Sequence, residues 1–158
     1  MKDDYTVSVK RFAKLTPKEI RRLKKLTFGR SGYSAMLPYL SAIEADILYA
    51  RKMRAIILLN KRGVIVAWAS LRKFRITRMN PFDDTDEVEI NVFTAPNYRK
   101  LGLGSILVGE AKRYATRTWR GSSLLAYAHD AGSLSFYERN KFFATGSKLP
   151  TDMRWKKA

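Results

Sequence analysis

The sequence predicts a single α/β domain over residues 1–158, built on a sheet of mixed strand direction. Short apolar runs alternate with amphipathic stretches in the order β-α-α-β-β-β-α-β-α-β-β. A hairpin signal beside helical crossovers places antiparallel and parallel neighbours in one sheet. With 158 residues, 46% of them hydrophobic, and no cysteine, the chain can bury one core without disulfides.

The N-terminal third is expected to hold one strand and two helices. Residues 5–9 alternate as a half-buried strand does. Thr16 and Glu19 fit an N-cap and its capping-box acid, with a proline at the first helical position, so a helix is expected over 17–26. Apolar residues recur at helical spacing over about 34–51, which predicts a second helix.

The rest of the chain alternates strands with helices. Apolar runs at 55–59 and 64–69 flank the turn sequence Asn60-Lys61-Arg62-Gly63, which predicts a hairpin. The other expected elements are a strand from about 87 to 93, a helix over 105–119, a strand over 123–128, a helix over 132–139 and closing strands at 142–145 and 153–155.

The chain is strongly basic. Lysine and arginine total 31 against 14 aspartate and glutamate, which gives a formal charge of +17. Such a charge attracts polyanions, so it either serves binding to nucleic acid or an acidic protein, or only keeps the protein soluble. The cations that favour RNA binding are Lys14, Lys18, Arg21, Arg22, Lys24, Lys25, Arg72, Lys73, Arg75 and Arg78.

Several classes of protein are excluded by what the chain lacks. Zero cysteines exclude a disulfide framework and a cysteine nucleophile, and the single His129 argues against a histidine metal site, so no metal is expected. No apolar segment approaches the roughly 18 residues of a membrane span, and the start has no apolar leader. The expected protein is therefore soluble and cytoplasmic, without membrane contact; a dimer is compatible with the sequence.

A glycine turn lies between an expected strand and an expected helix, at Arg99-Lys100-Leu101-Gly102-Leu103-Gly104. Glycines let the backbone approach a ligand, and the first amides of a helix attract anions, as do the two cations. A dinucleotide-binding loop needs a third glycine where Leu107 stands, and a P-loop needs a following Lys-Ser/Thr. Neither condition holds, so the turn predicts another kind of pyrophosphate cradle.

Two motifs together resemble the GNAT superfamily, whose members transfer an acyl group from acyl-CoA, usually to an amine. Arg99, Gly102 and Gly104 match its pyrophosphate signature, and the residues 130–142 are similar to its Asn-x-x-Ala-x-x-x-Tyr-Glu-Lys-x-Gly-Phe motif. The order of elements matches over nearly the whole chain.

The second motif departs from the family pattern at three positions. Asp130 stands for an asparagine, Ser133 for an alanine and Lys141 for the glycine that ends the last helix. Because a Cβ disfavours the left-handed conformation at a helix end, Asn140 is expected to take that conformation instead.

The resemblance implies an N-acetyltransferase that uses acetyl-CoA as its co-substrate and a primary amine as acceptor. It implies contacts to acetyl-CoA at Val92, Phe93, Thr94, Arg99, Lys100, Leu101, Gly102, Leu103, Gly104, Ser105, Asp130, Ser133 and Tyr137. Tyr137 is implied to protonate the leaving thiolate, because a phenol keeps its proton at neutral pH. Its alternative role is to pack the last helix onto the sheet.

Glu89 is the expected general base. It shares a strand face with Glu87 by the period of two, and its alternative role is a surface ion pair. His129 with Asp130 is a second candidate pair. Glu87 and Glu89 also belong to an acidic cluster with Asp83, Asp84 and Asp86, which either attracts a cationic amine or solubilises a loop.

Three functions therefore compete. The first is acetyl transfer to a protein or a small-molecule amine. The second is an RNA-associated acetyltransferase acting on aminoacyl-tRNA or a ribosomal target. The third is a catalytically silent module of the same fold that binds nucleic acid or an acidic protein. The intact Gly102, Gly104 and Tyr137 favour an enzyme.

Overall fold

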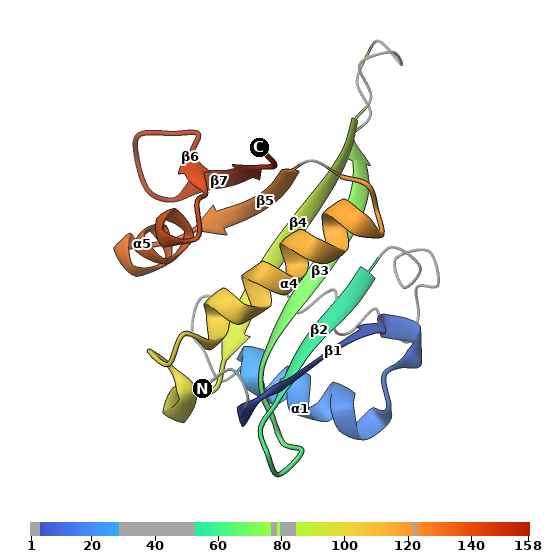
Figure 1. Ribbon diagram of the computed structural model, residues 1–158. Coiled ribbons are helices and arrows are strands. Elements are labelled where there is room, and N and C mark those ends of the chain that lie inside the picture. Colours follow the sequence, from blue (N-terminus) through green and yellow to red (C-terminus); the bar gives the residue numbers. More distant parts are fainter. Residues whose placement is uncertain (1–3, 29–52, 77–78, 80–84, 122) are drawn as a thin grey trace. The chain divides into compact units, whose positions relative to one another are not determined.

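A computed structural model describes residues 4–28, 53–76, 79, 85–121 and 123–158 (Figure 1). The second expected helix, over about 34–51, lies outside these residues, as do Asp83 and Asp84 of the acidic cluster.

The described strands form one mixed sheet in the order β1-β2-β3-β4-β5-β7-β6. The pairs β1·β2, β5·β7 and β6·β7 are antiparallel, and β4·β5 is parallel. The expected α/β fold with mixed strand directions is therefore confirmed. The strands are β1 (Thr6–Arg11), β2 (Met53–Leu59), β3 (Ile65–Ile76), β4 (Thr85–Thr94), β5 (Ser123–Ala128), β6 (Phe143–Ala144) and β7 (Thr151–Lys156).

The described helices are α1 (Pro17–Phe28), α4 (Leu103–Arg117) and α5 (Ala131–Arg139), with short 3₁₀ turns η2 (Phe12–Lys14) and η5 (Pro96–Tyr98). Contacts along the chain divide into two compact units, the first within Met1–Ser70 and Val92–Leu107 and the second within Leu71–Asn91 and Val108–Ala158. A single domain over residues 1–158 stays a prediction.

The core of the first unit is built around Trp68, which is fully buried. Its ring stacks on Phe93 with centroids 5.3 Å apart and lies 6.1 Å from the ring of Phe12. The indole N–H donates to Thr27 Oγ1 at 3.3 Å, so the polar edge of the ring is satisfied inside the core.

Helix α1 begins as the sequence predicts. The Glu19 N–H donates to Thr16 Oγ1 at 3.1 Å, and the Thr16 N–H donates to Glu19 Oε1 at 2.9 Å, so the capping box is formed. Ile20, Leu23 and Leu26 are buried against the core, as their helical spacing requires.

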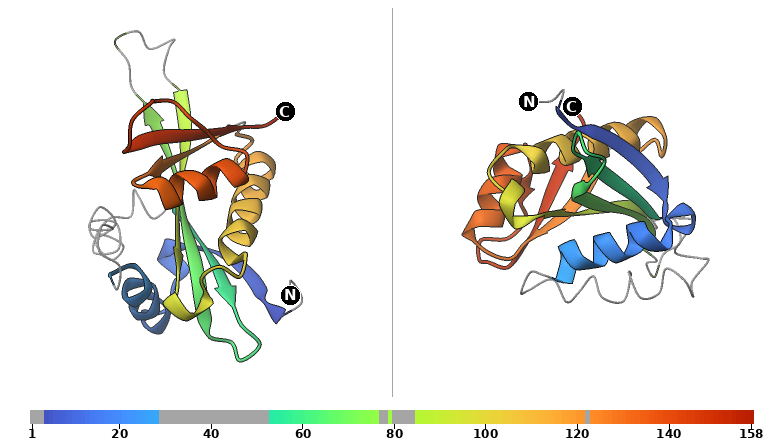
Figure 2. Two further views of the ribbon diagram at one scale, coloured as in Figure 1. Left: turned by 90° about the vertical axis from the view of Figure 1, so that its left-hand side faces the viewer. Right: turned by 90° about the horizontal axis from the view of Figure 1, so that it is seen from below.

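In the second unit, α5 packs on β5 and precedes the strand pair β6·β7 (Figure 2). Residues of β5 alternate between buried and more exposed positions, with Leu124, Ala126 and Ala128 inside. The buried Met153 of β7 lies opposite Ala126, which continues this core across the pair.

Candidate functional site

The turn before α4 has the backbone geometry of an anion cradle. Lys100 and Gly102 take left-handed conformations with φ of 63° and 78°, and α4 begins at the next residue, Leu103. The Gly102 carbonyl accepts the Ile106 N–H at 3.3 Å, so Gly102 stands directly before the first helical turn. The first amides of a helix have no acceptor within it, so those of Leu103 and Gly104 are available to an anion.

The turn exposes its charges while it stays fixed to the core. Arg99, Lys100 and Gly102 are exposed, whereas the side chain of Leu103 is 1% exposed and anchors the turn. Arg99 Nε donates to the Thr94 carbonyl at 3.4 Å, which ties the turn to the end of β4. An anion that binds at this turn would therefore meet cations carried by a fixed backbone.

Near the end of β4, a ligand could reach the backbone but not the buried side chain of Phe93. Phe93 is fully buried on Trp68, while Val92 and Thr94, which point to the other face, are half-buried. The Ala95 N–H donates to the Val66 carbonyl at 2.9 Å, so the chain stays paired up to the turn. Any contact of Phe93 to acetyl-CoA would therefore use its main chain.

In the second unit, Asp130 and Ser133 form the capping box of α5. Asp130 Oδ1 accepts the Ser133 N–H at 2.8 Å, and the Asp130 N–H donates to Ser133 Oγ at 3.1 Å. The hydrogen bond from the Ser133 backbone, followed by that from its hydroxyl, lowers the pKa of Asp130 below its ordinary value. Asp130 and Ser133, which both depart from the family motif, thus form a helix cap together. Their contacts to acetyl-CoA stay predictions.

Tyr137 is buried near the end of α5, with 6% of its surface exposed. Its ring lies between those of Phe136 and Phe142, with centroid distances of 5.1 and 5.2 Å. The Phe142 N–H donates to the Tyr137 carbonyl at 3.0 Å, which ties Phe142 to the last turn of α5. The tyrosine therefore packs as a core aromatic, and its role as proton donor stays a prediction.

The expectation for the end of α5 is wrong by one residue. Asn140 has a φ of −94° and Lys141 has a φ of 70°, so the lysine itself takes the left-handed conformation. Helix α5 runs through Arg139 and Asn140 is its C-cap, which places the left-handed position at the following residue. Its cost is offset because Asn140 Nδ2 donates to the Phe136 carbonyl at 2.9 Å and the Asn140 carbonyl accepts Lys112 Nζ at 2.6 Å.

Lys112 itself holds α4 to the C-terminal part of the second unit. Its ammonium lies 4.9 Å from the ring centre of Trp155 and 5.7 Å from that of Phe142. Burial, and then the charge of Lys141, lower the pKa of Lys112 below its ordinary value.

The expected base Glu89 is half-buried and has two polar neighbours. Arg72 Nη2 lies 3.7 Å from Glu89 Oε2, and Asn91 Nδ2 donates to Glu89 Oε1 at 3.3 Å. Its strand position pairs with Leu125 of β5. The ion pair matches the structural alternative for this residue, and its role as a base stays a prediction.

The other described acids of the cluster are also paired with cations. Glu87 is buried, and its Oε2 accepts Arg154 Nη1 at 2.9 Å; Asp86 lies 3.6 Å from Arg75 and 4.0 Å from Lys73. These pairs favour a structural role over attraction of a cationic amine. The sequence offered no signal for Arg154, because it lies 67 residues from Glu87.

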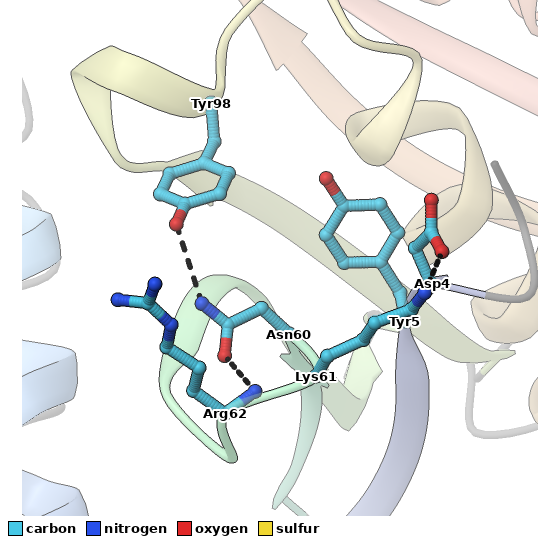
Figure 3. Close-up of a pocket in the computed structure, with 6 residues that line it drawn as sticks. All are labelled: Asp4, Tyr5, Asn60, Lys61, Arg62 and Tyr98. Atoms are coloured by element: carbon cyan, nitrogen blue, oxygen red, sulfur yellow. Dashed lines mark hydrogen bonds and ion pairs between the residues drawn. The ribbon is translucent and has the colours of Figure 1, made fainter.

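A hollow of about 370 Å³ in the first unit was not expected from the sequence (Figure 3). It lies over the turn of the β2–β3 hairpin. Asn60 Nδ2 donates to the Tyr98 hydroxyl at 3.2 Å, and Lys61 pairs with Asp4 at 2.8 Å. The residues that line this tyrosine pocket are Asp4, Tyr5, Asn60, Lys61, Arg62 and Tyr98.

The predicted site residues divide between the units. Those from Val92 to Ser105 lie in the first unit, while Glu89, Asp130, Ser133 and Tyr137 lie in the second. Among the described residues, no group of three or more histidines, cysteines or acids is placed to hold a metal ion, and no helix is long and apolar enough to cross a membrane.

Comparison with protein families decides what kind of protein this is. The model of the acetyltransferase (GNAT) family matches residues 18–142, which include the glycine turn, all of α5 and the whole motif at residues 130–142. The chain belongs to the GNAT acetyltransferase family. No curated protein matches this GNAT chain in a sequence search.

Solved structures resemble this GNAT fold along its whole length. An acyl-CoA N-acyltransferase from Pseudomonas aeruginosa has a TM-score of 0.69 at 23% identity and covers 98% of this chain and 99% of its own. Campylobacter jejuni N-acetyltransferase PseH, in complex with acetyl coenzyme A, has 0.62 at 17%, covering 97% and 100%. A mutant of the toxin AtaT, bound to the C-terminus of the antitoxin AtaR and acetyl-CoA, has 0.62 at 14%, covering 98% and 94%.

Proposed function

We propose that this GNAT protein is an N-acetyltransferase that carries an acetyl group from acetyl-CoA to a primary amine of a protein or a small molecule. The observation that carries the proposal is the turn before α4, where left-handed Lys100 and Gly102 lead into the helix start between exposed cations. PseH and AtaT hold acetyl-CoA in their structures, which supports acetyl-CoA as the donor here. A cytoplasmic location is part of the proposal.

The turn would hold the pyrophosphate of acetyl-CoA. Arg99 and Lys100 supply two positive charges, and the helix start supplies amides whose dipoles point at the same anion. The main chain of Val92 to Thr94 would run beside the pantetheine arm and polarise the thioester carbonyl. Such fixed donors stabilise the charge that develops on this oxygen.

The chemistry needs one proton acceptor and one proton donor. A lysine-like amine has a pKa near ~10.4, so it must lose a proton before it attacks. In the proposal Glu89 takes this proton, directly or through one water. The nitrogen–carbon bond then forms, the nitrogen releases its second proton to solvent, and the carbon–sulfur bond breaks. Tyr137 gives its phenolic proton to the departing sulfur and is then reprotonated from solvent.

Thermal unfolding with and without acetyl-CoA tests the donor site. A ligand at about 100 times its Kd should stabilise the protein by about 2.7 kcal/mol. The double variant Arg99→Glu, Lys100→Glu should lose most of this shift, because it places two negative charges beside the pyrophosphate. The matched control Lys148→Glu, Lys157→Glu has the same change in charge at exposed positions and should keep the shift. An unshifted wild-type protein would contradict the proposal.

A further inference from the structure

Three cations on α1 form an exposed row. Lys18, Arg21 and Lys25 are exposed and recur at the spacing i, i+3, i+7, so they lie on one side of the helix. None of the three has an acidic partner in the described part of the chain. We call these three residues the basic ridge: Lys18, Arg21 and Lys25.

The ridge differs from four of the other cations that the sequence grouped with it. Arg22 Nε donates to the Ile65 carbonyl at 2.9 Å, which fixes α1 to the start of β3. Arg72 pairs with Glu89, and Lys73 and Arg75 pair with Asp86. The fold therefore uses those cations internally, and it leaves the ridge as charge directed at solvent.

The tyrosine pocket belongs to the same unit as the ridge. The hydrogen bond from Arg22 to the Ile65 carbonyl links α1 to the start of β3. The hairpin turn that precedes β3 carries Arg62. Figure 3 shows Tyr5 and Tyr98 on two sides of this turn, with the Lys61 side chain running to Asp4 and that of Arg62 running the other way. One unit thus holds a row of exposed charges, the exposed Arg62 and two half-buried tyrosines, of which Tyr98 also packs against the core.

The pocket also offers a hydrogen-bond donor. The Tyr98 hydroxyl oxygen accepts from Asn60 Nδ2 at 3.2 Å, which leaves its own hydrogen to be donated. Asn60 Oδ1 accepts the Arg62 and Val64 amides at 2.9 and 3.0 Å, so the amide is held in this orientation. The Tyr98 hydroxyl can therefore donate a hydrogen bond to a hydroxyl oxygen of a ligand.

These features fit a single strand of nucleic acid better than a bilayer. A helix that binds a bilayer needs an apolar face to insert, but Ile20, Leu23 and Leu26 of α1 are all buried in the core. A row of exposed cations suits the phosphates of a single strand, and aromatic rings in the same unit suit its unstacked bases.

We propose that the basic ridge and the tyrosine pocket bind unpaired RNA. The ridge contacts phosphates, the rings of Tyr5 and Tyr98 stack on a base, and the Tyr98 hydroxyl donates to a ribose 2′-hydroxyl. The last contact selects RNA, because DNA lacks this group. This binding goes beyond acetyl transfer and does not depend on it.

The ridge is tested by the salt dependence of binding. Fluorescence anisotropy of a labelled oligouridylate is measured over a salt series for the wild type and for the variant Lys18→Gln, Arg21→Gln, Lys25→Gln. Loss of three phosphate contacts should reduce the slope of log K against log salt by about 2, at ~0.7 for each contact. The matched control Arg139→Gln, Lys148→Gln, Lys157→Gln removes the same charge from exposed positions of the second unit and should keep the slope. Equal slopes for both variants would overturn the proposal.

The pocket is tested by the preference for RNA over DNA. Tyr98→Phe keeps the ring and removes the donor, so the ratio of oligouridylate to oligodeoxythymidylate affinity should fall about two- to twelvefold, as loss of one hydrogen bond predicts. A ratio that does not change, or tighter binding to anionic vesicles or polyglutamate than to RNA, would overturn the assignment. The ridge variant should keep its stabilisation by acetyl-CoA. Failure to bind RNA with that stabilisation intact would reject this inference alone, and leave the acetyltransferase proposal standing.

Discussion

Tyr137→Phe is expected to lower kcat with an amine acceptor by about 100-fold. A positioned general acid contributes roughly 10²–10⁴-fold, and phenylalanine cannot give a proton to the leaving sulfur. Phenylalanine keeps the ring contacts with Phe136 and Phe142, so the variant should stay folded. Steady-state kinetics should show the loss in kcat with little change in KM for acetyl-CoA.

A second tyrosine provides the control for this experiment. Tyr127 of β5 is 41% exposed and has no part in the proposed chemistry, so Tyr127→Phe should leave kcat unchanged. If Tyr137→Phe stays within about threefold of the wild type, the proton-donor role is untenable and Tyr137 acts only in packing.

Arg154→Met is expected to cause a large loss of stability. It leaves the Glu87 carboxylate, whose side chain is 11% exposed, without its cationic partner inside the second unit. Breaking a buried pair costs about 3–5 kcal/mol, and Arg154 retains some exposure, so we expect about 2 to 3 kcal/mol in urea unfolding. The double variant Glu87→Gln, Arg154→Met should recover most of this loss, because no buried charge is left unpaired.

An exposed pair provides the matched control for burial. Arg113 pairs with Glu110 on the surface of α4, where its side chain is 53% exposed. Arg113→Met should cost at most about 1 kcal/mol, as is typical of exposed ion pairs. Equal losses for Arg113→Met and Arg154→Met would show that burial of Glu87 does not make its pair important.

Local signals predicted the elements that depend on neighbouring residues. The capping box of α1 spans Thr16 to Glu19, so a four-residue pattern was enough to place the helix start. The apolar run at residues 123–128 matched β5 at both ends. Helix α4 begins at Leu103, before the expected residue 105, because Gly102 turns the chain within one residue.

Elements that depend on distant partners were predicted less well. The expected strand at 64–69 stopped where charges interrupt the apolar run, yet β3 continues to Ile76. The reason is that Arg72 pairs with Glu89, and Lys73 and Arg75 with Asp86, which are acids of the neighbouring strand β4. Charges that end a strand in isolation thus extend it when the next strand carries their counterions.

The candidate site follows the same rule. The glycine turn and the motif at residues 130–142 each lie in one short stretch of sequence, so the sequence alone revealed both. The tyrosine pocket depends on the ion pair between Asp4 and Lys61 and on the hydrogen bond between Asn60 and Tyr98, which lie 38 residues apart. No short sequence pattern predicts such pairs. Lys141 shows a further limit, because the residue before it, Asn140, accepts a hydrogen bond from Lys112 of a second helix, 28 residues away in the sequence.

Release of CoA from acetyl-CoA, measured with a panel of amine, peptide and aminoacyl-tRNA acceptors, tests the central claim most directly. The account predicts release that depends on one class of acceptor, with an acetylated product seen by mass spectrometry. Release should fall with Tyr137→Phe and stay with Tyr127→Phe. Stabilisation by acetyl-CoA without release of CoA to any class of acceptor would contradict the claim that this chain is an acetyltransferase.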